Sequence, residues 1–133
     1  FFKDRWYGFD DGLYSGARLL EILTREADPS ALLNSLPQSD STPELHLHLG
    51  EGENVIVMDK LRADAKFPGN QQIITIDGLR VEYEDGFGLA RSSNTTPVIV
   101  MRFEAETPEA LARIQGQFKS VILAAKPDAE LPF

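Results

Sequence analysis

Two strand-like segments, residues 73–76 and 79–84, are separated only by Asp77-Gly78. This dipeptide favours a two-residue turn between antiparallel strands, because Asp and Gly tolerate the positive φ angles that such a turn requires. A second Asp-Gly pair, at positions 85 and 86, leads into the apolar residues 87–90. The middle of the chain is therefore predicted to form successive antiparallel strands.

Further elements flank these strands. Residues 44–49 alternate Leu with polar side chains, and residues 98–103 are mostly apolar, so both segments are predicted to be strands. Thr107 followed by proline is typical of a helix start, because Thr caps free N–H groups and Pro fits the first helical position. This last helix is predicted to bury one stripe of side chains: Leu111, Ile114, Phe118, Val121 and Ala125.

Residues 53–66 carry two conflicting signals. Val55-Ile56-Val57 favours a strand, whereas Val57, Leu61 and Ala65 recur at helical spacing, and we predict a helix that ends before Pro68-Gly69. After residue 43 the predicted order is strand, helix, four strands, helix. This order predicts an α+β fold: a four- to five-stranded antiparallel sheet with both helices packed on one face.

The first 43 residues differ in composition from the rest. Residues 1–9 include five aromatic side chains, which favour packing against another surface. Residues 11–26 repeat apolar side chains at helical spacing and are predicted to form an amphipathic helix. Residues 28–43 are rich in Pro, Ser, Asn and Asp and are predicted to be a linker. The predicted domains are therefore 1–40 and 41–133.

Charge and cysteine content exclude several classes of protein. The 133 residues include 13 Lys+Arg and 21 Asp+Glu, which gives a net charge of −8. Clustered Lys and Arg hold phosphate backbones, so neither nucleic acid nor a membrane is expected as a partner. The absence of Cys excludes disulfides and thiol catalysis. Without a long apolar run or a leader peptide, a cytoplasmic location is expected, and the start at Phe1 without Met suggests a fragment.

The segment from Arg91 to Pro97 concentrates polar side chains between two apolar strands. It contains one guanidinium group, four hydroxyls and a carboxamide. Arg matches the geometry of phosphate, and the N–H groups of a tight turn supply further donors. The segment therefore suits a phosphate monoester, while the same residue types are also ordinary in a solvated hairpin loop.

Other polar groups have a structural explanation that we favour over a catalytic one. Glu44, His46 and His48 share one face of a predicted strand, where neighbouring metal ligands rarely converge. Asp10 and Asp11 precede a predicted helix and are expected to cap it rather than bind Mg²⁺. No nucleophile paired with a base is recognisable, so no catalytic residue and no metal ligand is assigned within this chain.

Residues 88–97 read Gly-Leu-Ala-Arg-Ser-Ser-Asn-Thr-Thr-Pro. This run resembles the phosphate-binding loop of the α-D-phosphohexomutase family, whose pattern is Arg-x-Ser-Asn-Thr. Residues 75–81 and 1–12 are also similar to the family, above all to its bacterial phosphomannomutases/phosphoglucomutases. The resemblance implies that residues 1–40 are the end of domain three, a helix remnant of an α/β domain with a linker. Residues 41–133 would form domain four, which has a TATA-box-binding-protein-like fold.

The resemblance also implies a function for the loop. These enzymes interconvert glucose (or mannose) 1-phosphate and 6-phosphate through a 1,6-bisphosphate intermediate. Domain four serves them as a mobile lid whose loop holds the substrate phosphate, while the second residue of the loop varies. In this chain the phosphate-binding residues would be Arg91, Ser93, Asn94 and Thr95, with Thr96 as a lesser candidate.

The family's other functional parts fall outside this chain. The catalytic phosphoserine and the Mg²⁺ ligands belong to other domains, so the chain alone is expected to be inactive. Its expected partners are a hexose phosphate and the remaining domains of the parent enzyme, with glucose 1,6-bisphosphate as intermediate or activator, and a monomer is expected. The preference between glucose and mannose is not determined by these residues. The alternative is a non-catalytic module that binds an anion or another phosphorylated ligand.

Overall fold

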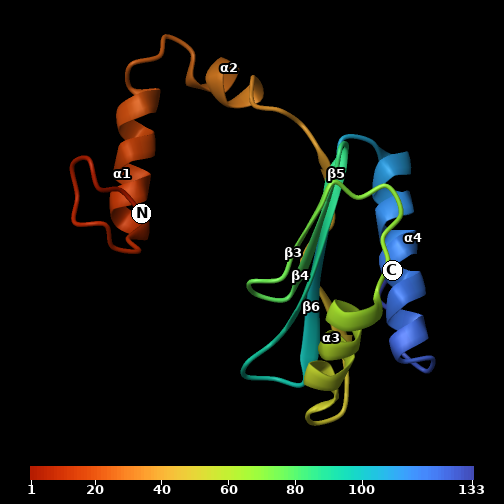
Figure 1. Ribbon diagram of the computed structural model, residues 1–133. Helices are drawn as coiled ribbons and strands as arrows, with labels where there is room; N and C mark the ends of the chain where they lie inside the picture. The colour runs from red at the N-terminus through yellow and green to blue at the C-terminus, as the bar shows by residue number, and fades with distance from the viewer. The chain divides into compact units, whose positions relative to one another are not determined.

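The computed structural model describes residues 1–133 as two compact units, Phe1–Pro37 and Gln38–Phe133 (Figure 1). The first unit contains two helices, α1 (Gly12–Leu23) and α2 (Pro29–Asn34). The second unit contains all six strands and two further helices: β1 (Asp40–Ser41), β2 (Leu45–His48), α3 (Glu53–Asp64), β3 (Gln72–Ile74), β4 (Leu79–Tyr83), β5 (Gly86–Ser92), β6 (Val98–Ala105) and α4 (Pro108–Ala125). That residues 1–40 end a preceding domain stays a prediction.

The strands form one antiparallel sheet in the order β1-β6-β5-β4-β3, and β2 also pairs with β6. The antiparallel α+β fold is thus confirmed, but the sheet has six strands rather than four or five. The additional strand is β1, inside the stretch predicted to be a linker. A strand of only two residues is too short to show a periodic pattern in the sequence. Strand β1 is held by pairing with β6, and the next residue, Thr42, donates a hydrogen bond from its N–H to the Phe103 carbonyl (2.9 Å).

Both helices of the second unit pack on the same face of the sheet, where they also contact each other (Figure 1). The core lies between these layers, and its aromatic centre is Phe118 of α4. The Phe118 ring lies 4.8 Å from the Phe67 ring and 5.1 Å from the Phe103 ring, measured between centroids. Phe118 packs directly over Gly88 of β5, where a Cβ atom would lie 2.3 Å from the ring. Gly88 therefore allows the closest approach of helix and sheet.

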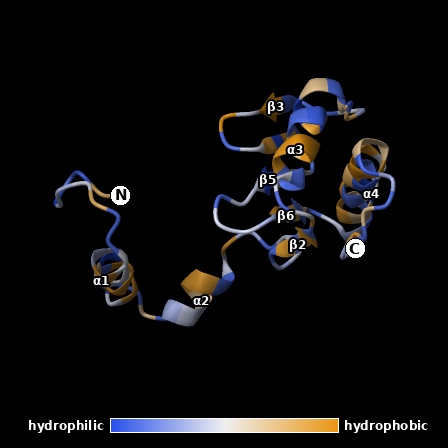
Figure 2. Ribbon diagram, turned by 90° about the horizontal axis from the view of Figure 1, so that it is seen from below, coloured by the Kyte–Doolittle hydropathy of each residue, from blue (hydrophilic) through white to orange (hydrophobic).

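Helix α4 begins where the sequence predicts, but the residues that it buries against the sheet are not all those of the predicted stripe. The Thr107 hydroxyl accepts a hydrogen bond from the Ala110 N–H (3.2 Å), with Pro108 at the first helical position. The buried residues are Ala110, Ile114, Phe118 and Ile122, which recur every four positions. The predicted Leu111, Val121 and Ala125 are only partly buried at the margin of the core. Partly buried apolar residues also lie beside the stripe, so the mixture of apolar and polar residues along α4 (Figure 2) did not define its centre.

Residues 53–64 form a helix, α3, as predicted from their spacing. Val57 and Leu61 are buried, as are Met58 and Asn54, whereas Ala65 is partly buried just beyond the helix. Val55 and Ile56, which favour a strand, are on the exposed side of the helix. Tertiary packing of one face therefore overrides the local β propensity of this segment.

The first unit corrects the prediction that residues 28–43 are a linker without regular structure. Helix α1 ends at Leu23, before Asp28-Pro29, and this pair begins a second helix, α2, because Pro is well accommodated in the first helical turn. The Asp28 carboxylate caps α2 by accepting a hydrogen bond from the Ala31 N–H (3.0 Å). Asp11 caps α1 in the same way through the Tyr14 N–H (2.9 Å), as predicted. Helix α1 begins at residue 12 and ends at residue 23, inside the predicted range 11–26.

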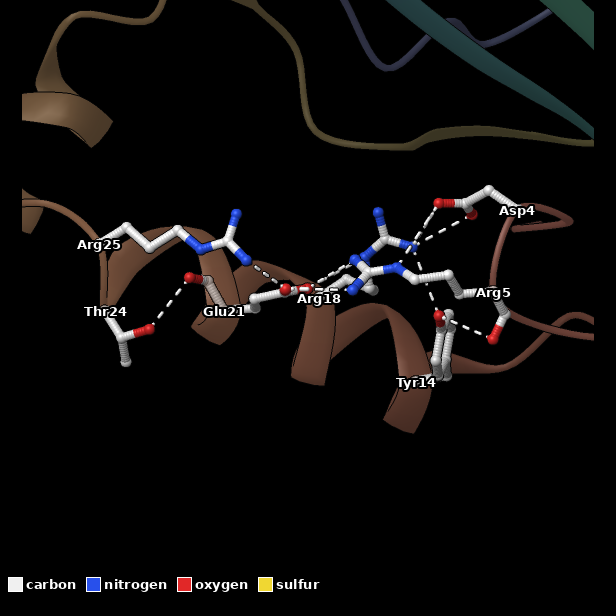
Figure 3. A network of polar contacts seen from close by, with 7 residues as sticks. All are labelled: Asp4, Arg5, Tyr14, Arg18, Glu21, Thr24 and Arg25. Carbon is white, nitrogen blue, oxygen red and sulfur yellow. Dashed lines mark hydrogen bonds and ion pairs between the residues drawn. The ribbon is translucent and has the colours of Figure 1, made fainter.

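A network of charged groups holds residues 1–9 on α1 (Figure 3). Glu21 accepts two hydrogen bonds from Arg5 (3.1 and 2.7 Å), which lower the pKa of the Glu21 carboxyl below its usual value. Arg18 donates to Asp4 (3.1 Å). The Tyr14 hydroxyl donates to the Arg5 carbonyl (3.2 Å). No residue of α1 or α2 is buried, so the aromatic segment is fastened within this unit by polar contacts and ring stacking.

We expect Gly88→Ala to destabilise the second unit by about 1–3 kcal/mol, because the new methyl group would overlap the Phe118 ring. Gly116→Ala is the matched control. Gly116 is exposed in the middle of α4 with open space around it, so alanine should stabilise that helix by about 0.5–1 kcal/mol. Urea unfolding followed by circular dichroism measures both changes. Equal stability of the two variants would contradict this account of the helix–sheet contact.

Candidate functional site

The polar segment lies at one end of the sheet, where β5 turns into β6. Arg91 and Ser92 are the last residues of β5 rather than loop residues, which corrects the prediction of a loop from Arg91 onward. The pairing of Arg91 with Val100 places it within the sheet ladder. The loop then closes at its base by a hydrogen bond from the Ser93 N–H to the Val98 carbonyl (2.9 Å). Two paired strands therefore hold both ends of the loop.

The Ser93 hydroxyl is the centre of the loop. Its oxygen accepts hydrogen bonds from the N–H groups of Thr95 and Thr96 (both 3.3 Å) and from the Thr96 hydroxyl (3.0 Å). The Thr95 hydroxyl is also within 3.5 Å of it. Several donors thus converge on one oxygen atom. An anionic oxygen bound here would be offered the same backbone and hydroxyl donors.

A pocket of about 300 Å³ opens beside these donors. One wall is the loop, with Ser93, Asn94, Thr95 and Thr96 among its lining residues. The other wall is the start of α3, where Gly52 has a left-handed backbone (φ +77°) and no side chain caps the helix. The structure therefore brings four of the five predicted residues together in one pocket.

Arg91, the fifth predicted residue, does not line this pocket. Its guanidinium lies 3.3 Å from the carboxylate of Asp77 in the turn between β3 and β4. Gly78 (φ +90°) makes this approach possible, because a Cβ atom there would lie 2.6 Å from the Arg91 Cβ and 2.4 Å from the Ala90 carbonyl. The carbonyl of Gly78 also accepts a hydrogen bond from Arg62 of α3 (3.3 Å). The turn is thus held by two contacts, one with Arg91 of β5 and one with Arg62 of α3.

Asn54 is a residue of this site that the sequence analysis missed. Only 5% of its surface is exposed, and its amide nitrogen donates to the Ser92 hydroxyl (2.7 Å) and to the Ser93 carbonyl (3.2 Å). The sequence did contain one indication of this role: Asn54 is a polar residue on the same face of the predicted helix as Val57 and Leu61. Its partners are 38 and 39 residues away along the chain, so sequence spacing alone did not reveal them.

The turn before α3 is held by charged groups. Glu53 accepts a hydrogen bond from the Gly50 N–H (2.7 Å) and another from the Lys126 ammonium (3.2 Å). The Gly50 N–H, followed by Lys126, lowers the pKa of the Glu53 carboxyl below its usual value. Glu53 therefore remains a carboxylate near neutral pH and fixes the segment that forms one wall of the pocket.

The other polar groups form no additional site in the structure. Glu44 and His46 form a hydrogen-bonded pair (2.9 Å), and the rings of His46 and His48 are 6.2 Å apart. No three His, Asp or Glu side chains are placed to hold a metal ion together.

Trp6 stacks on Tyr14 at 4.4 Å between ring centroids. None of the helices has the length and apolar character to cross a membrane.

Comparison with known proteins identifies the family. The family model described as phosphoglucomutase/phosphomannomutase, C-terminal domain, matches residues 53–121, which is more than half of the chain. The chain belongs to this family. The match spans α3, the sheet from β3 to β6 and most of α4, and therefore includes the whole polar loop.

Relatives extend the similarity to the rest of the chain. A phosphoglucomutase of Neisseria meningitidis serogroup B is 66% identical over 122 residues, covering 91% of this chain and 26% of the relative. A phosphomannomutase/phosphoglucomutase of Pseudomonas aeruginosa PAO1 is 46% identical over 134 residues, covering 100% of this chain and 29% of the relative.

A solved structure agrees with these sequence matches. The crystal structure of a phosphoglucomutase/phosphomannomutase family protein from Burkholderia thailandensis is 71% identical, with a TM-score of 0.90, over 100% of this chain and 28% of that one. The chain thus spans between 26% and 29% of the length of these family members. The resemblance to the α-D-phosphohexomutases is therefore confirmed.

Proposed function

We propose that this chain supplies the phosphate clamp of a hexose-phosphate mutase that interconverts glucose (or mannose) 1-phosphate and 6-phosphate. The observation that carries the proposal is the convergence of donors from Thr95 and Thr96 on the Ser93 hydroxyl oxygen, beside a pocket that Asn94 also lines. Ser93, Asn94 and Thr95 match the family's phosphate-binding pattern, and Thr96 follows it directly. Membership of the phosphoglucomutase/phosphomannomutase family supports the same assignment.

The clamp would act by positioning rather than by bond making. The loop would hold the phosphate that does not react, so that the opposite end of the sugar meets the catalytic phosphoserine of another domain. A net charge of −8 gives no general attraction for phosphate, so recognition would depend on local donors. Arg91 is the cation nearest the loop in sequence, and it would exchange Asp77 for the substrate phosphate.

The remaining chemistry would belong to a longer parent enzyme. We place the phosphoserine, the Mg²⁺ ligands and the sugar-reading residues outside this chain. Glucose 1,6-bisphosphate would be the intermediate or activator, and the other domains of the parent would be its structural partners. A cytoplasmic, monomeric parent is part of the same proposal.

Binding of glucose 6-phosphate by this chain tests the clamp. We expect an NMR titration to shift the amide signals of residues 91–96 with roughly millimolar affinity, because a few charge-assisted bonds offset the association cost only modestly. Plain glucose should leave these signals unchanged. Equal responses to both sugars, or no response to either, would contradict the clamp. A phosphopeptide that binds more tightly than glucose 6-phosphate would favour the non-catalytic module instead.

Arg91→Ala should weaken glucose 6-phosphate binding by about tenfold or more, since a hydrogen bond to a charged group contributes about 1.5–3 kcal/mol. Arg102→Ala is the matched control, because Arg102 is an exposed arginine on the neighbouring strand β6. The control should bind as the unmodified chain does. Amide spectra report whether each variant is folded. Equal losses in both variants would show that general charge, and not Arg91, governs binding.

Asp77→Asn should strengthen glucose 6-phosphate binding about 1.5- to 5-fold. The Asp77–Arg91 pair is exposed, and such pairs contribute about 0.2–1 kcal/mol, which the ligand no longer has to replace. Asp59→Asn makes the same charge change at another exposed pair, with Arg62, and controls for the general field. The same titration measures both variants. If Asp59→Asn strengthens binding equally, the direct competition between Asp77 and phosphate is refuted.

We expect the chain alone to have no mutase activity. A coupled assay would supply glucose 1-phosphate, glucose 1,6-bisphosphate and Mg²⁺ and measure the formation of glucose 6-phosphate. The complete Neisseria meningitidis phosphoglucomutase serves as the positive control. Turnover by the 133-residue chain above the blank would overturn this expectation.

A further inference from the structure

The amide of Asn54 connects helix α3 to the point where β5 becomes the loop. Asn54 lies in the first turn of α3 and is almost completely buried. Its single side-chain nitrogen donates to two consecutive residues, Ser92 (hydroxyl, 2.7 Å) and Ser93 (carbonyl, 3.2 Å). An Asn amide has two N–H donors, so these two bonds use its full donor capacity.

The two bonds act on the residue that organises the loop. Ser93 presents its hydroxyl oxygen to the N–H groups of Thr95 and Thr96, while its carbonyl is held by Asn54. Fixing that carbonyl limits rotation of the peptide plane between Ser93 and Asn94, and so restrains the path of the backbone toward the N–H groups of Thr95 and Thr96. Asn54 also lines the pocket, but its amide donors are already bonded to Ser92 and Ser93, so it acts through these two residues and not as a further donor.

Helix α3 is a rigid support for this contact. Val57, Met58 and Leu61 on the same face are buried in the core, so the start of the helix has little freedom to move against the sheet. Ser92, by contrast, is the variable position of the phosphate-loop pattern. In this chain its hydroxyl is turned to α3 and bonded by Asn54, which gives the variable position an attachment role.

We propose that Asn54 is a positioning residue of the phosphate loop, acting through Ser92 and Ser93 to hold the donors ready before the ligand arrives. This inference rests on the proposed function. A preorganised loop loses less conformational freedom on binding, so removal of the anchor should lower affinity.

The test compares Asn54→Ala and Ser92→Ala with Asn70→Ala in the 133-residue chain. Asn70 also donates its amide to a backbone carbonyl, that of Phe67, and it does not line the pocket, so it is the matched control. We expect Asn54→Ala to weaken glucose 6-phosphate binding roughly three- to tenfold and Ser92→Ala roughly twofold. Asn70→Ala should bind as the unmodified chain does.

Two further readouts separate positioning from a merely structural role. Amide hydrogen exchange at Thr95 and Thr96 should accelerate in Asn54→Ala, while exchange in the core strand β6 should stay unchanged. Ser92→Thr keeps the hydroxyl and should restore the affinity lost in Ser92→Ala. This pair of variants decides the question even if Asn54→Ala does not fold.

The outcomes distinguish the two proposals. If the unmodified chain does not bind glucose 6-phosphate, the proposed function fails, and with it the ligand-binding role of Asn54. If the unmodified chain binds and the folded Asn54→Ala binds equally well, only the positioning role is overturned. Equal affinities of Ser92→Ala and Ser92→Thr would likewise overturn it.

Discussion

Strands β5 and β6 pair over seven residues, from Gly86 opposite Ala105 to Ser92 opposite Ile99, and this ladder places the other parts of the second unit. On the far edge of β6, both β1 and β2 find their partners. On the face of the sheet that the helices cover, Gly88 of β5 leaves room for the Phe118 ring. The polar loop emerges at the end of the same ladder, so its ends are fixed by the most extensively paired strands of the sheet.

The donors of the loop and of Arg91 make hydrogen bonds within the chain. The Ser93 oxygen accepts the N–H groups of Thr95 and Thr96, and the Asp77 carboxylate accepts from Arg91. These internal acceptors occupy donors that a phosphate would otherwise bind. A ligand therefore exchanges existing hydrogen bonds for stronger, charge-assisted ones, and only the difference contributes to affinity.

Local rules predicted the fold where the chemistry is local. The start of α4 at Thr107 requires a capping hydroxyl, and it could be assigned from a few adjacent residues. Asp77-Gly78 located the turn between β3 and β4, but β3 ends at Ile74 and only Gly78 of the pair has a positive φ, so the connection is longer than the predicted two-residue turn. The same rules failed for α2 and β1. Asp28-Pro29 lies in a segment with the composition of a linker, yet it begins α2, and β1 exists only through its pairing with β6. The centre of the buried stripe on α4 depended on the sheet beneath it.

The amino-acid sequence by itself determined that the sheet is antiparallel, the residue types of the loop and the family to which the chain belongs. Each of these depends on residues close together in the chain, whose spacing is visible without coordinates. The tertiary structure alone decided that Asn54 anchors the loop and that Arg91 pairs with Asp77 outside the pocket. These contacts arise because α3 and the β3–β4 turn pack beside the end of β5, and such distant approaches leave no periodic signal in the sequence.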